Sequence, residues 1–355
     1  MSKLNVKVAK IDEVLQHPNA DRLSILVIGG WKTCTANVER DGVWVCPYEP
    51  GDLVVYVPPD AVVPDDVAER WGVKDYLGSG NRVKTVKLRG CISRGFAVPV
   101  PVEGLPLGVE PIAGCDLTDH YGIVKWEPPV PVSEEHEAET DGFTRYTSIE
   151  RLQNYPGIFA IGEEVIVTEK IHGTNSRVAS MLTDDGVQVL CGTRTSQVKQ
   201  GTGSKYETPL HLLEVVQLLA SLREKYQEAQ AIVLFGEIFG RGVQKHLDYG
   251  YEKGEYGYRA FDIAVNGEYL SWARFHMLCA GCGVLTVPWI WNGPFSTERI
   301  EELSDGRSTI GGDHVREGVV VKPIAEREDD VLGRVILKSI GDGYETKQYG
   351  WTDSH

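Results

Sequence analysis

A lysine stands where an apolar strand is expected to end. Residues 164–167 read EVIV, an alternation typical of a β-strand, and Lys170 follows within three residues. His172 and Gly173 come next and predict a turn. An ammonium at the end of a buried strand is costly unless it is paired or bound to a ligand. Lys170 is therefore a candidate for chemistry rather than for packing.

Charged residues also interrupt later apolar stretches. Glu237 follows VLFG, Asp262 follows RAF, Glu317 precedes GVVVK, and Lys338 follows RVIL. Two sets of opposite sign result, the cations Lys170, Arg194, Lys322 and Lys338 and the carboxylates Glu237 and Glu317. Both signs at strand ends suit a polyphosphate with a divalent metal. Salt bridges between neighbouring strands are the alternative for each residue taken singly. That alternative weakens for the set, because five successive strands each carry a charge beside a glycine or an aromatic residue.

The elements that must position these residues fall into two domains. The chain has 355 residues, which exceeds the usual size of one core. Residues 5–11, 22–28, 51–60 and 82–90 predict short strands separated by glycine and proline, which favours a small barrel the size of an OB-fold over residues 1–125. Residues 126–142 are proline-rich and then acidic, as in an extended linker.

The remaining residues, 143–355, predict an α+β domain. Residues 209–229 have apolar residues at helical spacing, and 231–240, 259–265 and 317–323 are apolar strands. The fold class predicted for the whole chain is α+β, with an N-terminal OB-fold β-barrel and a C-terminal domain of antiparallel sheets flanked by helices.

Composition excludes some classes of protein. The net charge of −15 argues against bulk non-specific nucleic-acid binding, although it leaves room for a local basic groove. No stretch is long and apolar enough for a membrane span, and residues 1–10 lack a signal-peptide core. A cytoplasmic monomer is the simplest expectation. The seven cysteines have neither a disulfide framework nor a complete zinc pattern, which favours small buried thiols.

The motif EKIHGTN (residues 169–175) resembles the lysine motif of covalent nucleotidyltransferases, in the form typical of ATP-dependent RNA ligases. Five later elements are similar to those of the family and occur in its order: GTRTS (192–196), LFGEIFG (234–240), YRAFDI (258–263), REGVVVKP (316–323) and RVILKS (334–339). The resemblance covers most of residues 145–340 and implies a nucleotidyltransferase domain over 143–355.

The resemblance implies ATP and Mg²⁺ or Mn²⁺ as cofactors and a three-step reaction. Lys170 forms lysyl-AMP, the adenylate moves to a 5′-phosphate end, and a 3′-hydroxyl attacks that end. The attacking amine must be unprotonated, whereas a free lysine has a pKa of about 10.4. We expect burial and the neighbouring Lys322 and Lys338 to disfavour the ammonium.

Each further role is carried over from the family's motifs. Glu237 is expected at the ribose, Phe261 on the adenine, Glu317 at the metal through water, and Lys322 and Lys338 at the α-phosphate. Arg194 is expected at the sugar or at the acceptor phosphate. The remaining expected contacts are Glu169 with the nucleotide and Asn175 and Arg177 with the 5′-phosphate. His172 is expected to shape the turn rather than to titrate.

The last strand departs from the family pattern, in which two lysines alternate. Ile336 occupies the first lysine position, and Arg334 is the expected substitute from the same strand face. DNA ligases and capping enzymes carry an OB domain after this strand, but only residues 339–355 follow here, which disfavours both. The expected partners are RNA or RNA-containing duplex ends, in nick sealing and RNA repair.

The N-terminal part resembles the OB-type tRNA-binding modules of synthetases in HPNADRL (17–23), and such a domain before the transferase is the arrangement of nick-sealing RNA ligases. Along residues 82–90, Arg82 with Lys84 and Lys87 with Arg89 are predicted to share strand faces and to contact nucleic acid. A capped turn that shapes the barrel and a solvated basic face are the alternatives. An RNA-binding adaptor that only holds ATP, and an adenylyltransferase with another acceptor, also stay open.

Overall fold

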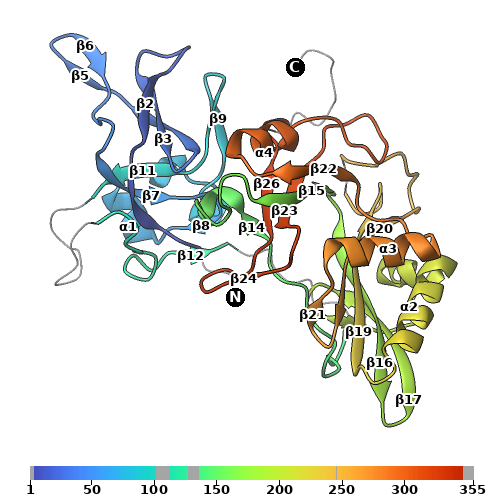
Figure 1. Ribbon diagram of the computed structural model, residues 1–355. Helices are drawn as coiled ribbons and strands as arrows, with labels where there is room; N and C mark the ends of the chain where they lie inside the picture. The colour runs from blue at the N-terminus through green and yellow to red at the C-terminus, as the bar shows by residue number, and fades with distance from the viewer. Residues whose placement is uncertain (1–3, 101–111, 127–135, 245, 347–355) are drawn as a thin grey trace. The chain divides into compact units, whose positions relative to one another are not determined.

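The computed structural model describes residues 4–100, 112–126, 136–244 and 246–346. The chain forms two compact units, which are coloured by residue number in Figure 1. Unit 1 comprises residues 1–129 and 151–157, and unit 2 comprises 130–150 and 158–355. Among the described residues, no helix has the length and apolar character needed to cross a membrane.

Unit 1 is built from short antiparallel strands. β1 (Lys7–Lys10), β7 (Leu53–Val57) and β11 (Phe96–Pro99) form one sheet, in the order β1-β7-β11. β2 (Glu13–Gln16), β3 (Leu23–Ile28) and β4 (Trp31–Ala36) form another. Alternate residues of these strands, such as Val8, Val55 and Leu26, are buried. The predicted OB-fold is confirmed.

Smaller elements complete unit 1. The two-stranded pairs are β5 (Val38–Arg40) with β6 (Val43–Val45), β8 (Ala61–Val62) with β12 (Val124–Lys125), and β9 (Val86–Leu88) with β10 (Cys91–Ser93). The helix α1 (Asp65–Arg70) and the 3₁₀ turns η1 (Lys74–Tyr76) and η2 (Ser79–Asn81) lie between β8 and β9.

Unit 2 contains two antiparallel sheets. The first has the order β13-β18-β17-β16-β19-β20-β21. Its strands are β13 (His136–Glu137), β16 (Thr174–Thr183), β17 (Gly186–Thr193), β18 (Gln197–Val198), β19 (Ala231–Phe239), β20 (Gly257–Val265) and β21 (Glu268–Tyr269). The second has the order β14-β26-β23-β15-β22. Its strands are β14 (Glu150–Arg151), β15 (Glu164–Lys170), β22 (Trp289–Pro294), β23 (Gly318–Pro323) and β26 (Leu337–Ile340).

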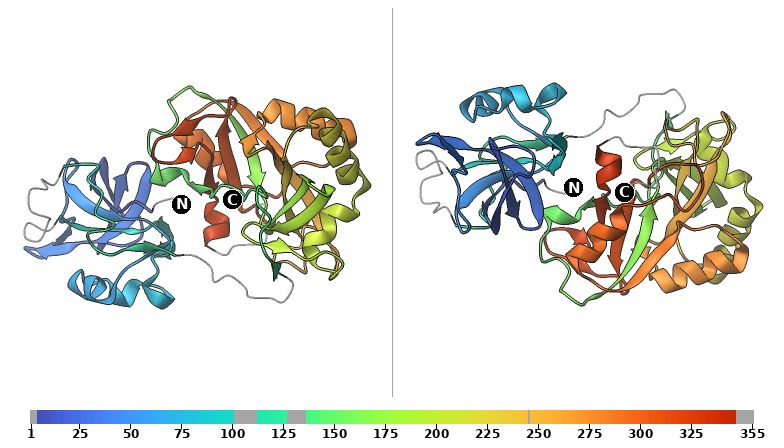
Figure 2. Two further views of the ribbon diagram at one scale, coloured as in Figure 1. Left: turned by 90° about the horizontal axis from the view of Figure 1, so that it is seen from below. Right: turned by 90° about the horizontal axis from the view of Figure 1, so that it is seen from above.

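Two helices cover one face of the first sheet, α2 (Leu213–Lys225) and α3 (Trp272–Cys282), which lie side by side in Figures 1 and 2. α2 begins later than the helix predicted over 209–229, because Pro209 lies in the 3₁₀ turn η4 (Lys205–His211). α4 (Thr297–Ser304) packs on β23 and β26, and α5 (Asp342–Glu345) follows β26. The 3₁₀ turn η3 (Leu152–Asn154) and the pair β24 (Glu328–Asp329) and β25 (Gly333–Arg334) are the remaining elements. The α+β class with antiparallel sheets is confirmed.

The linker predicted over 126–142 lies partly outside the described residues, at 127–135. The described part is not a free linker, because β13 pairs with β18 at the edge of the first sheet. Glu139 also forms an ion pair with Arg177, and the backbone N–H of Thr140 donates to Oε1 of Gln197. These polar contacts bind residues 136–140 to unit 2, and composition alone did not reveal them.

Candidate functional site

Lys170 is the last residue of β15, where the chain passes from the second sheet of unit 2 to the first. The turn that follows needs a glycine, since a Cβ on Gly173 would lie 2.2 Å from the carbonyl oxygen of Ile238 and 2.9 Å from Cγ of Glu237. β16 then pairs with β19, which places Asn175 opposite Glu237. The motif EKIHGTN therefore brings the ends of two sheets together.

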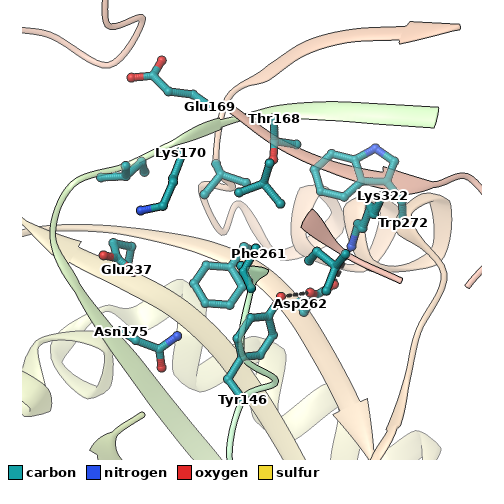
Figure 3. Close-up of a pocket in the computed structure, with 15 residues that line it drawn as sticks. Tyr146, Thr168, Glu169, Lys170, Asn175, Glu237, Phe261, Asp262, Trp272 and Lys322 are labelled. Carbon is teal, nitrogen blue, oxygen red and sulfur yellow. Dashed lines mark hydrogen bonds and ion pairs between the residues drawn. The ribbon is translucent and has the colours of Figure 1, made fainter. Parts of the chain in front are cut away.

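A pocket lies between the two sheets, with a volume of about 550 Å³ that includes the open solvent at its mouth. The second sheet contributes Thr168, Lys170, Val320 and Lys322, and the first contributes Asn175, Glu237, Phe261 and Asp262. Tyr146, Trp272 and Ile336 complete its apolar walls. Figure 3 shows the Lys170 side chain directed into this space, with Glu237 and Asn175 across from it.

Lys170 forms an ion pair with Glu317, with Nζ 2.7 Å from Oε2. Nδ1 of His172 lies 3.4 Å from the same oxygen, and the ring of His172 is held by the hydroxyl of Tyr344 at 2.9 Å. Burial would raise the pKa of Glu317, but Lys170 and His172 outweigh it and lower that pKa to about 2. Glu317 is thus ionised at neutral pH, and its partner is the candidate nucleophile.

The pKa of Glu237 is shifted in the opposite direction. Burial raises it to about 8, with Glu317 adding to the rise, while Lys170 and the backbone N–H of Gly173 oppose it. Glu237 therefore carries a proton over much of the neutral range, so it can donate as well as accept a hydrogen bond. Two carboxyl groups in one site are held in different protonation states by their surroundings.

The stability of the protein should reflect this protonated carboxyl. An unfolded glutamate releases its proton near pH 4.3, but Glu237 in the folded chain keeps it to about pH 8, so stability falls as pH rises through that window. We expect Glu237→Gln to increase the free energy of unfolding relative to wild type. This increase should be larger at pH 8 than at pH 5 by about 1–3 kcal/mol, a range that allows for solvent screening of a partly exposed group. Chemical denaturation at the two pH values measures the difference. Glu224→Gln, at an exposed helical position, is the control, and an equal effect of Glu237→Gln at both pH values would contradict the assignment.

Asp262 is the centre of a buried ion network beside the pocket. It is 1% exposed and accepts from Nζ of Lys322 at 2.6 Å, from Nη1 of Arg334 at 3.0 Å and from the hydroxyl of Tyr146 at 2.5 Å. Arg334 also forms a bidentate pair with Glu326, at 2.8 and 2.7 Å. Burial would raise the pKa of Asp262, but Arg334 and Lys322 lower it.

This network corrects the expectation for Arg334. Arg334 belongs to β25, not to the strand of Lys338, and its guanidinium is held by Asp262 and Glu326 and lies 3.6 Å over the ring of Tyr269. Ile336 instead contributes an apolar wall to the pocket. Lys322 lines the same pocket as Lys170, but its ammonium is paired with Asp262.

The side chains of Arg177 and Glu169 do not have the surroundings that the sequence predicted for them. Arg177 is fully buried, where it pairs with Glu139, donates to the carbonyls of Thr193 and Phe143, and lies 4.0 Å over the ring of Phe143. A side chain so enclosed does not contact a 5′-phosphate. Glu169 lies on the other side of β15 from Lys170, as Figure 3 shows, and its carboxylate accepts from Ser308 and Thr309. Only the rest of Glu169 lines the pocket.

Lys338 and Arg194 stand outside the pocket lining. Lys338 pairs with Val320 across β23 and β26, so it shares the sheet face of a pocket residue. Arg194 is exposed just after β17 and donates to Oγ of Ser148 at 3.1 Å. Both side chains remain candidates for contacts with phosphates beyond the pocket.

The motif HPNADRL has a structural role in unit 1. Nε2 of His17 lies 3.0 Å from the carbonyl of Leu88, and the amide of Asn19 donates to the carbonyl of Arg89 at 2.9 Å. These contacts hold the turn between β9 and β10. Arg89 occupies that turn with a positive φ of 48°, so it does not extend the strand face of Lys87 as predicted.

The two lysines predicted to contact nucleic acid, Lys84 and Lys87, are both exposed. Arg82 does not join Lys84, since its guanidinium is paired with Asp60 at 2.6 Å and stacks on Trp126 at 3.5 Å. Lys84, Lys87 and Arg89 are the exposed cations of this segment.

Sequence reasoning assigned no role to Tyr146, Trp272, Tyr344 or Glu326. Tyr146 reaches Asp262 from 116 positions away, and Glu326 pairs with Arg334 across the β24–β25 turn, and no pattern in the sequence marks either contact. Asp262 itself was visible in the sequence as a charge inside an apolar strand. Among the described residues, no group of three or more His, Cys, Asp or Glu side chains could hold a metal ion by itself.

Comparison with known proteins identifies both domains. The RNA ligase family model matches residues 163–340, and an OB-fold domain model matches residues 5–100. A Naegleria gruberi RNA ligase with pyrophosphate is 23% identical, with a TM-score of 0.72 over 97% of this chain and 98% of that chain. A variant of that ligase with ATP and Mn is 22% identical, with a TM-score of 0.74 over the same shares.

At these identities the solved structures support the fold alone. A search of curated proteins found no match. The RNA ligase family model, however, spans half of the chain and includes Lys170, Glu237, Phe261, Glu317 and Lys322. The chain therefore belongs to the RNA ligase family of enzymes.

Proposed function

We propose that this protein uses ATP to seal 3′-hydroxyl and 5′-phosphate ends of RNA at nicks in a duplex, through lysyl-AMP on Lys170. The observation that carries the proposal is the Lys170 amine, directed into a pocket lined by the Phe261 ring and the protonated Glu237, and paired with the ionised Glu317. A module that only bound nucleotide would not need an amine there.

The pocket suits an adenosine. Phe261 offers a ring face for the base and is itself braced by Tyr146, with ring centroids 4.7 Å apart. Glu237 is placed for the ribose hydroxyls, since its protonated form can both donate and accept. The Naegleria ligase, whose fold this chain shares, has been solved with ATP and with AMP, which supports an adenine nucleotide as the ligand.

The first step needs Lys170 as a free amine, but its Nζ is engaged by Glu317 at 2.7 Å. Release of Glu317 from Lys170 is therefore part of the activation that we propose. Glu317 fits a divalent cation, because it is ionised and because Mg²⁺ in such sites takes one or two carboxylates with substrate phosphates and water. When bound, a divalent cation would neutralise phosphate charge and compete with Lys170 for Glu317.

The bond changes then balance. Nζ of Lys170 forms a bond to the α-phosphorus, the bond from that phosphorus to the bridging oxygen breaks, pyrophosphate leaves with the electron pair, and the amine proton passes to solvent. An oxygen of the RNA 5′-phosphate next attacks the adenylate, and Lys170 leaves as the amine. The 3′-hydroxyl finally attacks the activated 5′-phosphate and AMP leaves. Each step is in-line phosphoryl transfer, in which positioning and charge neutralisation provide the catalysis.

The other assignments follow from position. Lys322 is proposed at the α-phosphate, where Asp262 fixes its ammonium, and Lys338 is proposed at the same group from the same sheet face. Asn175 lines the pocket next to Glu237 and is proposed at the acceptor 5′-phosphate. Arg194, Lys84 and Lys87 are proposed along the nucleic acid.

The test is sealing of labelled strands by the purified protein with ATP and Mg²⁺. Three acceptors of one sequence are compared, a nicked duplex with RNA on both sides of the nick, the same duplex with DNA on both sides, and the single strand alone. We expect joining of the nicked RNA at a rate at least about 10-fold above the single strand, since the duplex holds the two ends together. Faster joining of the single strand would overturn the nick assignment and leave the adenylation step intact.

A further inference from the structure

His172 adjoins the ion pair between Lys170 and Glu317. Its Nδ1 lies 3.4 Å from Oε2 of Glu317, the oxygen that Lys170 engages at 2.7 Å. Glu317 is buried, with 8% of its surface exposed. Formation of lysyl-AMP requires Lys170 to leave this oxygen. Among the described residues, His172 is then the side chain that remains beside Oε2, so the position of its ring affects the cost of that release.

Two tyrosine hydroxyls hold His172, and the first fixes its backbone. Tyr249, from the segment between β19 and β20, accepts from the backbone N–H of His172 at 2.7 Å. Tyr249 is 2% exposed, and its ring is enclosed by Phe239 and His314, with ring centroids 5.0 and 4.6 Å away. Its φ is +53°, a left-handed conformation that is unfavourable for a side chain of this size. Tertiary contacts therefore hold Tyr249 in place, and the backbone of His172 with it.

The second hydroxyl fixes the ring of His172. Nδ1 lies 2.9 Å from the hydroxyl of Tyr344, and the centroids of the two rings are 5.3 Å apart. The ionised carboxylate of Glu317, 3.4 Å away, favours the tautomer with a hydrogen on Nδ1. In that tautomer Nδ1 donates to the oxygen of Tyr344 and faces Glu317. A half-turn of the ring about χ2 would replace Nδ1 by Cδ2 and lose both contacts.

Tyr344 is itself anchored beside Glu317. It belongs to α5, which begins after Gly341, and the backbone N–H of Gly341 donates to the carbonyl oxygen of Glu317 at 3.0 Å. A Cβ on Gly341 would lie 2.6 Å from the carbonyl oxygen of Ser304, the last residue of α4, so the chain passes there too closely for a side chain. The backbone that carries Tyr344 is therefore fixed directly against the backbone of Glu317.

We propose that Tyr344 is a positioning residue for lysyl-AMP formation, which acts by holding the ring of His172 beside Glu317. The inference rests on the proposed function of Lys170 and adds a residue from outside the lining of the Lys170 pocket. With the hydroxyl of Tyr344 in place, Nδ1 of His172 stays beside Oε2 of Glu317 when Lys170 leaves, so the buried carboxylate keeps a partner. Without that hydroxyl the ring can turn, and the departure of Lys170 becomes less favourable. The affinity for ATP should not change, because the Tyr344 side chain does not line the pocket.

The rate of lysyl-AMP formation on the full-length protein provides the first test, measured with α-phosphate-labelled ATP and Mg²⁺ over a range of ATP concentrations. Tyr344→Phe removes the hydroxyl and keeps the ring. We expect its rate at saturating ATP to be about 10-fold below wild type, with an unchanged ATP concentration at half-maximal rate. Tyr226→Phe is the matched control, since it removes a hydroxyl of the same unit that is also half-buried and accepts from Arg274, and it should be labelled like wild type.

A double-mutant cycle shows whether Tyr344 acts through His172. In a His172→Ala background we expect Tyr344→Phe to change the rate by less than about 2-fold, because the ring that the hydroxyl positions is gone. Thermal unfolding of the variants checks that each is folded. An equal loss of rate in both backgrounds, or a wild-type rate in Tyr344→Phe, would overturn the proposal.

The ring signals of His172 test the contact without ATP, which separates failure of this inference from failure of the proposed function. His172→Ala assigns these signals in ¹⁵N spectra of the histidine rings. We expect them to shift in Tyr344→Phe and to stay in place in Tyr226→Phe. Unshifted signals in Tyr344→Phe would overturn the inference even when the wild-type protein is labelled. Shifted signals without any label on wild type would contradict lysyl-AMP formation, and the role of Tyr344 in it, but leave the contact between the two side chains established.

Discussion

Lys170→Ala should abolish the transfer of label from α-phosphate-labelled ATP to the protein, by at least about 10³-fold, since covalent catalysis has no route without its nucleophile. The reason lies in the geometry of the pocket. The Lys170 side chain is directed into the space between the two sheets. Lys322 also lines this pocket, but Asp262 binds its ammonium at 2.6 Å, and Lys338 lies outside the pocket lining.

The measurement is denaturing gel electrophoresis after incubation with Mg²⁺ and labelled ATP in the absence of RNA. Lys225→Ala, in the last turn of α2, is the matched control and should be labelled like wild type. Glu317→Gln should also reduce labelling, because it removes the expected metal contact. It removes the carboxylate that pairs with the Lys170 amine as well, but we expect the loss of the metal contact to dominate. Full labelling of Lys170→Ala would contradict the assignment of Lys170 as the nucleophile. Absence of label from the wild-type protein would contradict the proposed lysyl-AMP intermediate.

Much of the site could be read from local sequence, because the chemistry is carried by side chains at the ends of strands. The turn after Lys170 needs its glycine where β19 passes, so the motif marks the place where the two sheets meet. Glu237, Phe261 and Lys322 stand in apolar strands and Glu317 directly precedes one, and the structure brings them to the same pocket or into contact with Lys170.

The predictions that were wrong concerned side chains whose partners come from other parts of the chain. Arg334 and Arg177 looked like free cations in the sequence, but Asp262, Glu326 and Glu139 neutralise them in the fold. Glu169 was predicted to contact the nucleotide, but strand alternation directs its carboxylate toward Ser308 and Thr309 instead. A charged residue in an apolar strand is therefore costly to bury. Only the tertiary contacts decide whether a ligand or another side chain compensates for that cost.

The Asp262 network provides the largest expected effect on stability. Asp262→Asn keeps the size of the side chain but leaves Lys322 and Arg334 charged in an interior where they are 5% and 6% exposed. Breaking a buried ion pair by removing one partner costs about 3–5 kcal/mol, and we expect a loss of free energy of unfolding in this range. Glu326 still pairs with Arg334 at 2.7 Å and lies 3.6 Å from Nζ of Lys322, so the greater part of the cost should come from Lys322, whose remaining pair is the longer one.

Chemical denaturation at pH 7 measures that loss, and a second variant separates charge from packing. Asp262→Asn combined with Lys322→Met removes both members of the closest pair and should recover about 1–3 kcal/mol of the loss, because no ammonium then remains buried without its carboxylate. Asp313→Asn is the matched control, since Asp313 pairs with Arg307 at 3.2 Å on the surface and should cost less than about 1 kcal/mol. If Asp262→Asn proves no less stable than Asp313→Asn, the network contributes little to folding. Asp262 would then serve only to hold Lys322 in place beside the nucleotide.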